Sequence, residues 1–377
     1  MFRFLMIIIT IFLIHSSWPF IEKELNNTSI TKGISEVNTL KDSPEVKTTI
    51  QNIYTEIQTA LEQLVSLLNA PSEQNQKSTE SNSVPKVELT KPAQQEFSIF
   101  NIELGDSKDN VVSNLGTPNR STLNEYGTNW NAYHDNYHHF FMVMYDNQNK
   151  VAGLYTNQDL IASKNGIKLG TAKDTVRNLL GKPLTSIQKG LVLYKLPEQD
   201  EYDMFLIDNT YVTVFYDQHQ NNTVTAVQLI SKDLEDKKTD IYPKPSSQLK
   251  AGFEYQLFDL TNAARVQHQL PVLTWDEHVQ ATARKHSTDM AVHHYFDHTD
   301  LKGQSPFDRM AADHIFFQLA GENLAYGQFS SIFAHEGLMN SLGHRENILR
   351  KGYKYLGVGV AFNNESQPYF TENFYAK

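Results

Sequence analysis

The chain has 377 residues, of which 40% are apolar, so it is long enough for two or three domains that each bury a core. Its formal charge of −10, without a block rich in Lys and Arg, excludes a nucleic-acid surface, which needs positive charge against phosphate. The chain contains no cysteine. An exported domain of this composition relies on its cores rather than on disulfides, which fits a Gram-positive-type bacterial exterior.

Residues 1–21 carry one early arginine and then an unbroken apolar run from Phe4 to Ile14, a pattern typical of export. The run is short for a membrane-spanning helix, but Trp18 and Phe20 extend it towards the interface, and no A-x-A-like cleavage site follows. Two interpretations stay open: a cleaved signal peptide and a retained N-terminal membrane anchor. Both place the rest of the chain outside the cytoplasm.

Residues 22–95 are rich in Asn, Ser, Thr, Gln, Lys and Glu, which predicts a polar linker. Within it, apolar side chains recur three and four residues apart over 44–69 and predict an amphipathic helix. This helix either lies against a neighbouring domain or associates with a second copy as a short stalk. The apolar stripe consists of Ile50, Ile53, Ile57, Leu61, Leu64 and Leu68.

Residues 97–232 contain an internal repeat, in which "IELGDSKDNVVSNLGTPNR" (102–120) aligns without a gap with "IKLGTAKDTVRNLLGKPLT" (167–185). Each copy reads as a turn, a short helix and a Gly-x-Pro stop, followed by alternating aromatic and β-branched runs typical of antiparallel strands. The two units, about 97–160 and 162–232, are predicted to pack as one α+β domain that serves for binding or docking.

The cluster "YHDNYHH" in the first unit places His134, His138 and His139 close together. It admits two interpretations, a metal site and an exposed turn. Because the spacing gives no firm ligand geometry and the cluster precedes a strand, we interpret it as a turn.

Residues 233–250 are charged, contain two prolines and predict a second linker. From 251 to 377 the chain reads as one α+β domain. A first helix has Phe253 and Leu257 on its apolar face, a second has Val279 and Ala283, and two alternating strands close the chain. A layered arrangement of helices and sheet buries all of these elements.

Four motifs of this last segment occur in a telling order: "YFDH", "GENLAYG", "NSLGHRENIL" and "YKYLGVGVA". Together, over about residues 253–377, they resemble the signature of the CAP superfamily (cysteine-rich secretory proteins, antigen 5, pathogenesis-related 1) in its bacterial SCP-like branch. The doubled domain resembles the CAP-associated N-terminal domain. The resemblance implies a C-terminal three-layer α-β-α sandwich whose central cleft holds two histidines and one or two acidic residues, with a divalent metal in some members.

Carried over to this sequence, the resemblance assigns His298, Glu322 and His344 to the cleft and makes them the expected ligands of a divalent metal, zinc first. Many members have a second acid, but Ser341 occupies that position here. Glu336, in the preceding turn, is predicted to supply the missing carboxylate. Two imidazoles and a carboxylate are able to hold zinc with one position open, or to transfer protons without a metal.

Two functions remain. The first is an extracytoplasmic binding module of the bacterial cell envelope, with the doubled domain as adaptor and with a lipid, a wall component or a protein as ligand. The alternative is a metal-dependent hydrolase or protease that uses the same cleft. We prefer the first and assign no catalytic residue, because neither Ser305 nor Ser341 lies in a nucleophile-elbow context and cysteine chemistry is excluded.

Overall fold

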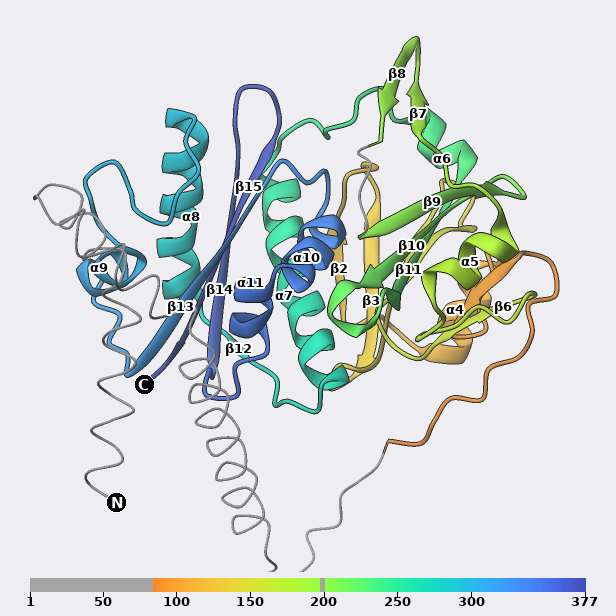
Figure 1. Cartoon of the computed structure of the whole chain (residues 1–377), viewed down its shortest axis with the longest axis horizontal. Coiled ribbons are helices and arrows are strands. Elements are labelled where there is room, and N and C mark those ends of the chain that lie inside the picture. Colours follow the sequence, from red (N-terminus) through yellow and green to blue (C-terminus); the bar gives the residue numbers. More distant parts are fainter. Residues whose placement is uncertain (1–83, 197–200) are drawn as a thin grey trace, which may run out of the picture. The chain divides into compact units, whose positions relative to one another are not determined.

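The computed structural model describes residues 84–196 and 201–377 (Figure 1). These residues belong to one compact unit that begins at Ser83. The export segment 1–21 and the amphipathic helix 44–69 lie outside the described residues. Within the described ranges, no helix combines the length and the apolar character needed to cross a membrane.

The N-terminal part of the described chain is built on a seven-stranded antiparallel sheet, with short ribbons and helices around it. The strands of this N-terminal part are β1 (Phe97–Ile99), β2 (Arg120–Leu123), β3 (Asn129–Asp135), β4 (His138–Tyr145), β5 (Val151–Thr156), β6 (Ile161–Ser163), β7 (Ser186–Lys189), β8 (Val192–Lys195), β9 (Tyr202–Ile207), β10 (Thr210–Asp217) and β11 (Thr223–Ser231). Its helices are α4 (Lys108–Leu115), α5 (Lys173–Leu180), the 3₁₀ turn η1 (Gln218–Gln220) and α6 (Lys232–Lys237).

The order of the large sheet is β2-β3-β4-β5-β11-β10-β9. The central strands β5 and β11 pair antiparallel, and they join the strands that follow α4 to those that follow α5. Both helices pack on one face of the sheet through Val111 and Val176. Each ends at a glycine with positive φ, Gly116 at 78° and Gly181 at 86°. This arrangement suits two similar units, while the internal repeat itself stays a prediction.

The histidine cluster lies at the tight turn between β3 and β4, where Asn136 and Tyr137 both have positive φ. Nδ1 of His134 accepts the amide of Tyr137 at 3.0 Å, and the His134 ring stacks on the Tyr137 ring. Burial lowers the pKa of His134 to about 4. The turn interpretation therefore matches the structure.

The first predicted linker is wrong at its C-terminal end, and the second, 233–250, is wrong at both ends, since α7 begins at Ser247. Residues 84–95 lie on the domain because the carboxylate of Glu103 accepts the amides of Ala93, Gln94 and Gln95 at 2.5–2.8 Å. In the second linker, 233–250, helix α6 takes up the first residues. Helix α6 is held in place because its Glu235 is buried and accepts a hydrogen bond from the ammonium group of Lys189, which is also buried.

The C-terminal part forms a four-stranded mixed sheet with helices on both faces, so the described chain is an α+β protein. The sheet order is β12-β14-β15-β13, with only the β12–β14 pair parallel. Its elements are α7 (Ser247–Gln267), β12 (Thr274–Trp275), α8 (Glu277–His293), α9 (Pro306–Ala312), β13 (Leu319–Tyr326), α10 (Ser331–Asn340), α11 (Leu342–Ile348), β14 (Tyr355–Phe362) and β15 (Pro368–Ala376).

Alternating residues of β14 face different helices. Leu356, Val358 and Val360 point towards α7 and belong to the same hydrophobic core as its apolar side chains. Gly357 and Gly359 face α8 so closely that a Cβ at either position would overlap the helix backbone. The two glycines therefore allow the helix to lie directly on the sheet.

Helices α7 and α10 lie between the two sheets (Figure 1) and share one hydrophobic core with both. Phe253 of α7 stacks on Phe370 of β15, while Phe333 of α10 meets Phe215 of β10 edge-on at 5.1 Å. The backbone of α7 comes close to β2, since a Cβ at Gly252 would overlap the carbonyl oxygen of Leu123. The two domains are thus packed as one body.

Gly252→Ala is expected to destabilise this packing by about 1–3 kcal/mol, because the added methyl meets backbone rather than a movable side chain. Gly343→Ala on α11 is the matched control, since a Cβ there has no atom within 4 Å. Urea denaturation of both variants measures the difference. Equal midpoints for the two variants would contradict the close approach.

A second prediction concerns Glu372 of β15, which is fully buried and accepts hydrogen bonds from Thr261 and Asn323 at 2.8 and 3.1 Å. Burial raises its pKa from 4.5 to about 7. The unfolded chain therefore ionises at lower pH than the folded one, so stability is lost as the pH rises from about 4.5 through 7.

Glu372→Gln keeps the shape and removes this titration. We expect the variant and the wild type to be equally stable near pH 4, and the variant to gain up to about 3 kcal/mol by pH 8. Denaturant titrations at both pH values test this. A stability difference that does not change with pH would be incompatible with a buried, protonated Glu372.

Candidate functional site

The candidate site is organised around Glu322 on β13, an edge strand of the C-terminal sheet. Its side chain is only 2% exposed, and both carboxylate oxygens are engaged. Oε1 accepts from Nδ1 of His298 at 2.9 Å, and Oε2 accepts from Nη2 of Arg309 at 2.7 Å. Glu322 therefore fixes the ring orientation of His298, which is itself half exposed.

Arg309 of α9 also holds the loop that carries His298. Its Nη1 donates to the carbonyl of His298 at 2.8 Å and to that of Gln304 at 2.9 Å. The helix is positioned by a capping box in which Ser305 and Asp308 exchange hydrogen bonds. Sequence reasoning missed Arg309, because its only signal was this short capped helix.

His344 enters the site from α11, on the other side of β13. Its Nδ1 lies 2.8 Å from Oγ of Ser341, the residue at the position of the family's second acid. Ser341 is the N-cap of α11 but makes no capping hydrogen bond, so its hydroxyl serves the imidazole instead. Burial, followed by the nearby charge of His298, lowers the pKa of His344.

Two asparagines tie α11 to β13. Nδ2 of Asn323 donates to the carbonyl of His344 at 3.1 Å, and Nδ2 of Asn347 donates to the carbonyl of Glu322 at 3.2 Å. Gly321 belongs to the same contact, since a Cβ there would overlap the hydroxyl of Tyr353. The structure therefore brings His298, Glu322 and His344 to one edge of the sheet.

Glu336 is not brought to this edge. It lies on α10, is 3% exposed, and its Oε1 accepts the hydroxyl of Tyr155 in the N-terminal domain at 2.5 Å. Burial, with the charge of Asp217, raises its pKa to about 7. The expectation that Glu336 completes the cleft set thus fails, because that face of α10 is buried against the other domain.

The expected zinc ligands do not fit as a set of three. Each oxygen of Glu322 already accepts a hydrogen bond, and the adjoining guanidinium of Arg309 disfavours a cation there. Among the residues that the structure describes, no group of three or more His, Cys, Asp or Glu could hold a metal ion. A metal on His298 and His344 stays a prediction, with Glu322 as the group that orients His298.

The groups left for a ligand are the Nε2 atoms of the two histidines, neither of which has a hydrogen-bond partner within 84–196 and 201–377. With Nδ1 engaged in both rings, each Nε2 accepts or donates one hydrogen bond according to the tautomer. This arrangement is suited to binding a polar group and to proton transfer.

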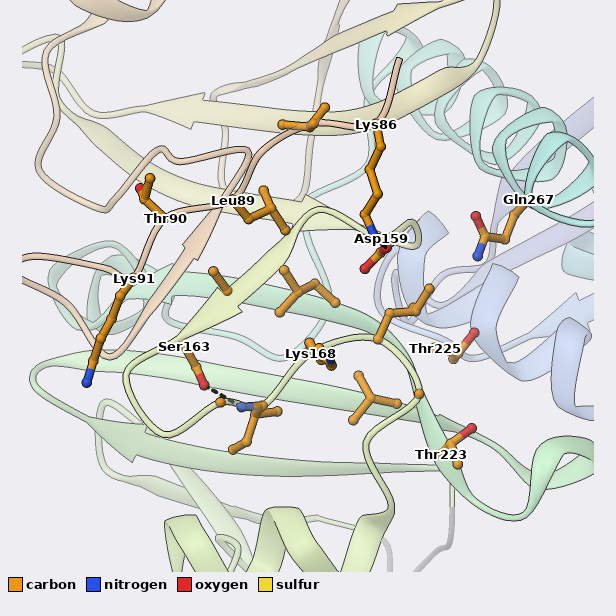
Figure 2. A pocket seen from close by; sticks show the side chains of 18 of the residues that line it. Lys86, Leu89, Thr90, Lys91, Asp159, Ser163, Lys168, Thr223, Thr225 and Gln267 are labelled. Atoms are coloured by element: carbon orange, nitrogen blue, oxygen red, sulfur yellow. Dashed lines mark hydrogen bonds and ion pairs between the residues drawn. The ribbon is translucent and has the colours of Figure 1, made fainter. Parts of the chain in front are cut away.

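A groove of about 1170 Å³ lies elsewhere and contains none of these residues. Figure 2 shows it between residues 86–91 and the loops of the N-terminal domain. Lys86 pairs with Asp159 at 2.8 Å across it, and Ser163 accepts the amide of Ile167 at 2.7 Å. Its rim is thus partly closed by its own contacts.

Comparison with known proteins gives two family matches. Residues 104–240 match the CAP-associated N-terminal family, and residues 258–374 match the cysteine-rich secretory protein family. The first match covers most of the N-terminal domain, and the second covers most of the C-terminal domain.

Three relatives are informative. The chain is 30% identical over 290 residues to the uncharacterised membrane protein YlbC of Bacillus subtilis, covering 72% of this chain and 82% of the relative. It is 38% identical over 140 residues to the B. subtilis protein YkwD, covering 37% of this chain and 53% of the relative. The crystal structure of an extracellular SCP-domain protein from Bacillus anthracis matches with a TM-score of 0.64 and 25% identity, covering 78% of this chain and all of the other.

The electrostatic link between the two imidazoles is testable. His298→Asn removes the charge that lowers the pKa of His344, so that pKa is expected to rise towards its ordinary value of 6.5. NMR titration of the imidazole resonances measures it, with His293→Asn at the exposed end of α8 as the control. An unchanged His344 titration would show that the two rings are not neighbours.

Proposed function

This chain belongs to the CAP superfamily, as its four motifs predict, and carries a CAP-associated domain before its CAP domain. From this premise we propose that it is a ligand-binding module of the bacterial cell envelope. His298 and His344 contact the ligand, Glu322 and Arg309 position His298, and the N-terminal domain acts as adaptor. The ligand is a lipid, a wall component or a protein.

One observation carries the proposal: both oxygens of Glu322 are engaged, one by His298 and the other by Arg309, which also holds the loop of His298. A hydrolase of the metal-dependent kind needs a free ligand set and a base beside it. Here the exposed part of the site consists of two oriented imidazoles, an arrangement that favours recognition by hydrogen bonding.

The site of action that we propose is outside the cytoplasmic membrane. The apolar run at 4–14 and the similarity to an extracellular and to a membrane protein support this location. We further propose that the C-terminal domain is organised as the three-layer sandwich of its family, with α8 and α9 on one face of the sheet and α7, α10 and α11 on the other.

The test compares the full wild-type chain with His298→Ala/His344→Ala for binding to purified Gram-positive cell wall and to phospholipid vesicles. We expect the double variant to bind one of these at least ~10-fold more weakly, a loss of about 1.4 kcal/mol, with an unchanged melting temperature. His293→Ala/His294→Ala, which removes two exposed histidines, is the matched control.

Equal binding by all three proteins would refute the proposal. A zinc titration in parallel addresses the alternative. If the wild type binds zinc, the double variant does not, and only the loaded wild type cleaves wall peptides, then the metal-dependent hydrolase replaces the binding module.

A further inference from the structure

A second pocket, of about 200 Å³, lies between the two domains. The N-terminal domain contributes Glu201, Tyr202 and Phe215 to its wall, and the C-terminal domain contributes the segment 326–329 and one face of α10. Its size suits a ligand no larger than an amino-acid side chain. No residue of the histidine site lines it.

The polar atoms that this pocket presents include three acceptors. Glu336 uses Oε1 for Tyr155, and its Oε2 has no hydrogen-bond partner among the described residues. Oε1 of Gln328 is buried and likewise unpartnered in that part of the chain. Glu201 adds a half-buried carboxylate. Unpaired acceptors in a buried site cost free energy, so they call for a donor from a ligand.

Within the described residues, Glu336 forms no ion pair. The charge of Arg345 favours the ionised form of Glu336, but Nη2 of that arginine is bonded to Asp217 at 2.8 Å. A buried carboxylate without a cation is unfavourable, and its raised pKa expresses that cost. A ligand that brings a positive charge to the carboxylate removes this free-energy cost.

The remaining walls are aromatic. Phe333 meets Tyr202 and Phe215 edge-on, each at 5.1 Å between ring centroids. The Phe329 ring is tilted against that of Phe333, with 4.2 Å between their centroids. Rings of this kind attract cations over their faces. The molecule already uses this contact nearby, where the ammonium group of Lys238 lies 5.6 Å from the Phe329 centroid.

We propose that this interdomain pocket binds a primary ammonium group on an alkyl chain, held by Glu336 and Glu201 and flanked by the aromatic rings. Three N–H donors and one positive charge match the acceptors and the negative charge of the site. The ammonium group comes either from a free amine or from a lysine-like side chain of an envelope peptide. Because the ligand touches both domains, its binding stabilises their association.

The experiment is calorimetric titration of the full chain with three probes: cadaverine, the uncharged 1-pentanol and Nα-acetyl-lysine methylamide. We expect cadaverine to bind at least ~10-fold more tightly than 1-pentanol. Glu336→Gln and Glu201→Gln are each expected to weaken cadaverine binding at least ~10-fold. Stronger binding of the lysine derivative than of cadaverine assigns the site to peptides, and the reverse assigns it to free amines.

The matched control is Glu125→Gln, which neutralises another buried carboxylate whose pKa burial raises to about 7 but which does not line the pocket. It should bind cadaverine like the wild type. The proposal is overturned if both charged probes bind no better than 1-pentanol, or if the two pocket variants bind as tightly as the control. His298→Ala/His344→Ala should leave cadaverine binding intact, so failure here is distinguishable from failure of the cleft function.

Discussion

The burial of helix α7 on nearly all sides is the constraint on which the rest of the structure depends. Fourteen of its 21 residues are buried, so its polar side chains need partners in several directions. Glu254 pairs with Arg284 of α8, and Asp259 pairs with Arg120 of β2. The guanidinium of Arg265 donates to the carbonyls of Ile348 and Arg350. One helix thereby fixes the distance from the N-terminal sheet to the C-terminal sheet. Both sheets contribute residues to the hydrophobic core that surrounds it.

The sequence was informative where pattern and local structure agree. The order of the four motifs identified the family, and the repeated Gly-x-Pro stops located α4 and α5. It was uninformative where tertiary contacts decide. The motif at 320–327 was not assigned to a strand, yet it forms β13, because its pairing partner β15 lies some fifty residues later in the chain. Helix α6 was read as linker, because its stabilising contact comes from Lys189 on a distant hairpin.

The same distinction holds for the candidate site. His298, Glu322 and His344 were predictable because the family motifs carry them. Glu336 was misassigned, because sequence proximity to His344 says nothing about which face of α10 meets a second domain. The role of Arg309 in the site could not be predicted, since an arginine on a short polar helix has no periodic signature. Both acids turn out to be engaged inside the structure, Glu322 by an imidazole and Glu336 by the hydroxyl of Tyr155 at the domain boundary.

Helix α11 has only seven residues and carries two neighbouring side chains with different partners. His344 belongs to the candidate site, while Arg345 next to it forms an ion pair with Asp217 of the N-terminal domain. Because the two residues are adjacent on one short helix, the ion pair of Arg345 anchors the backbone that carries His344 to the N-terminal domain.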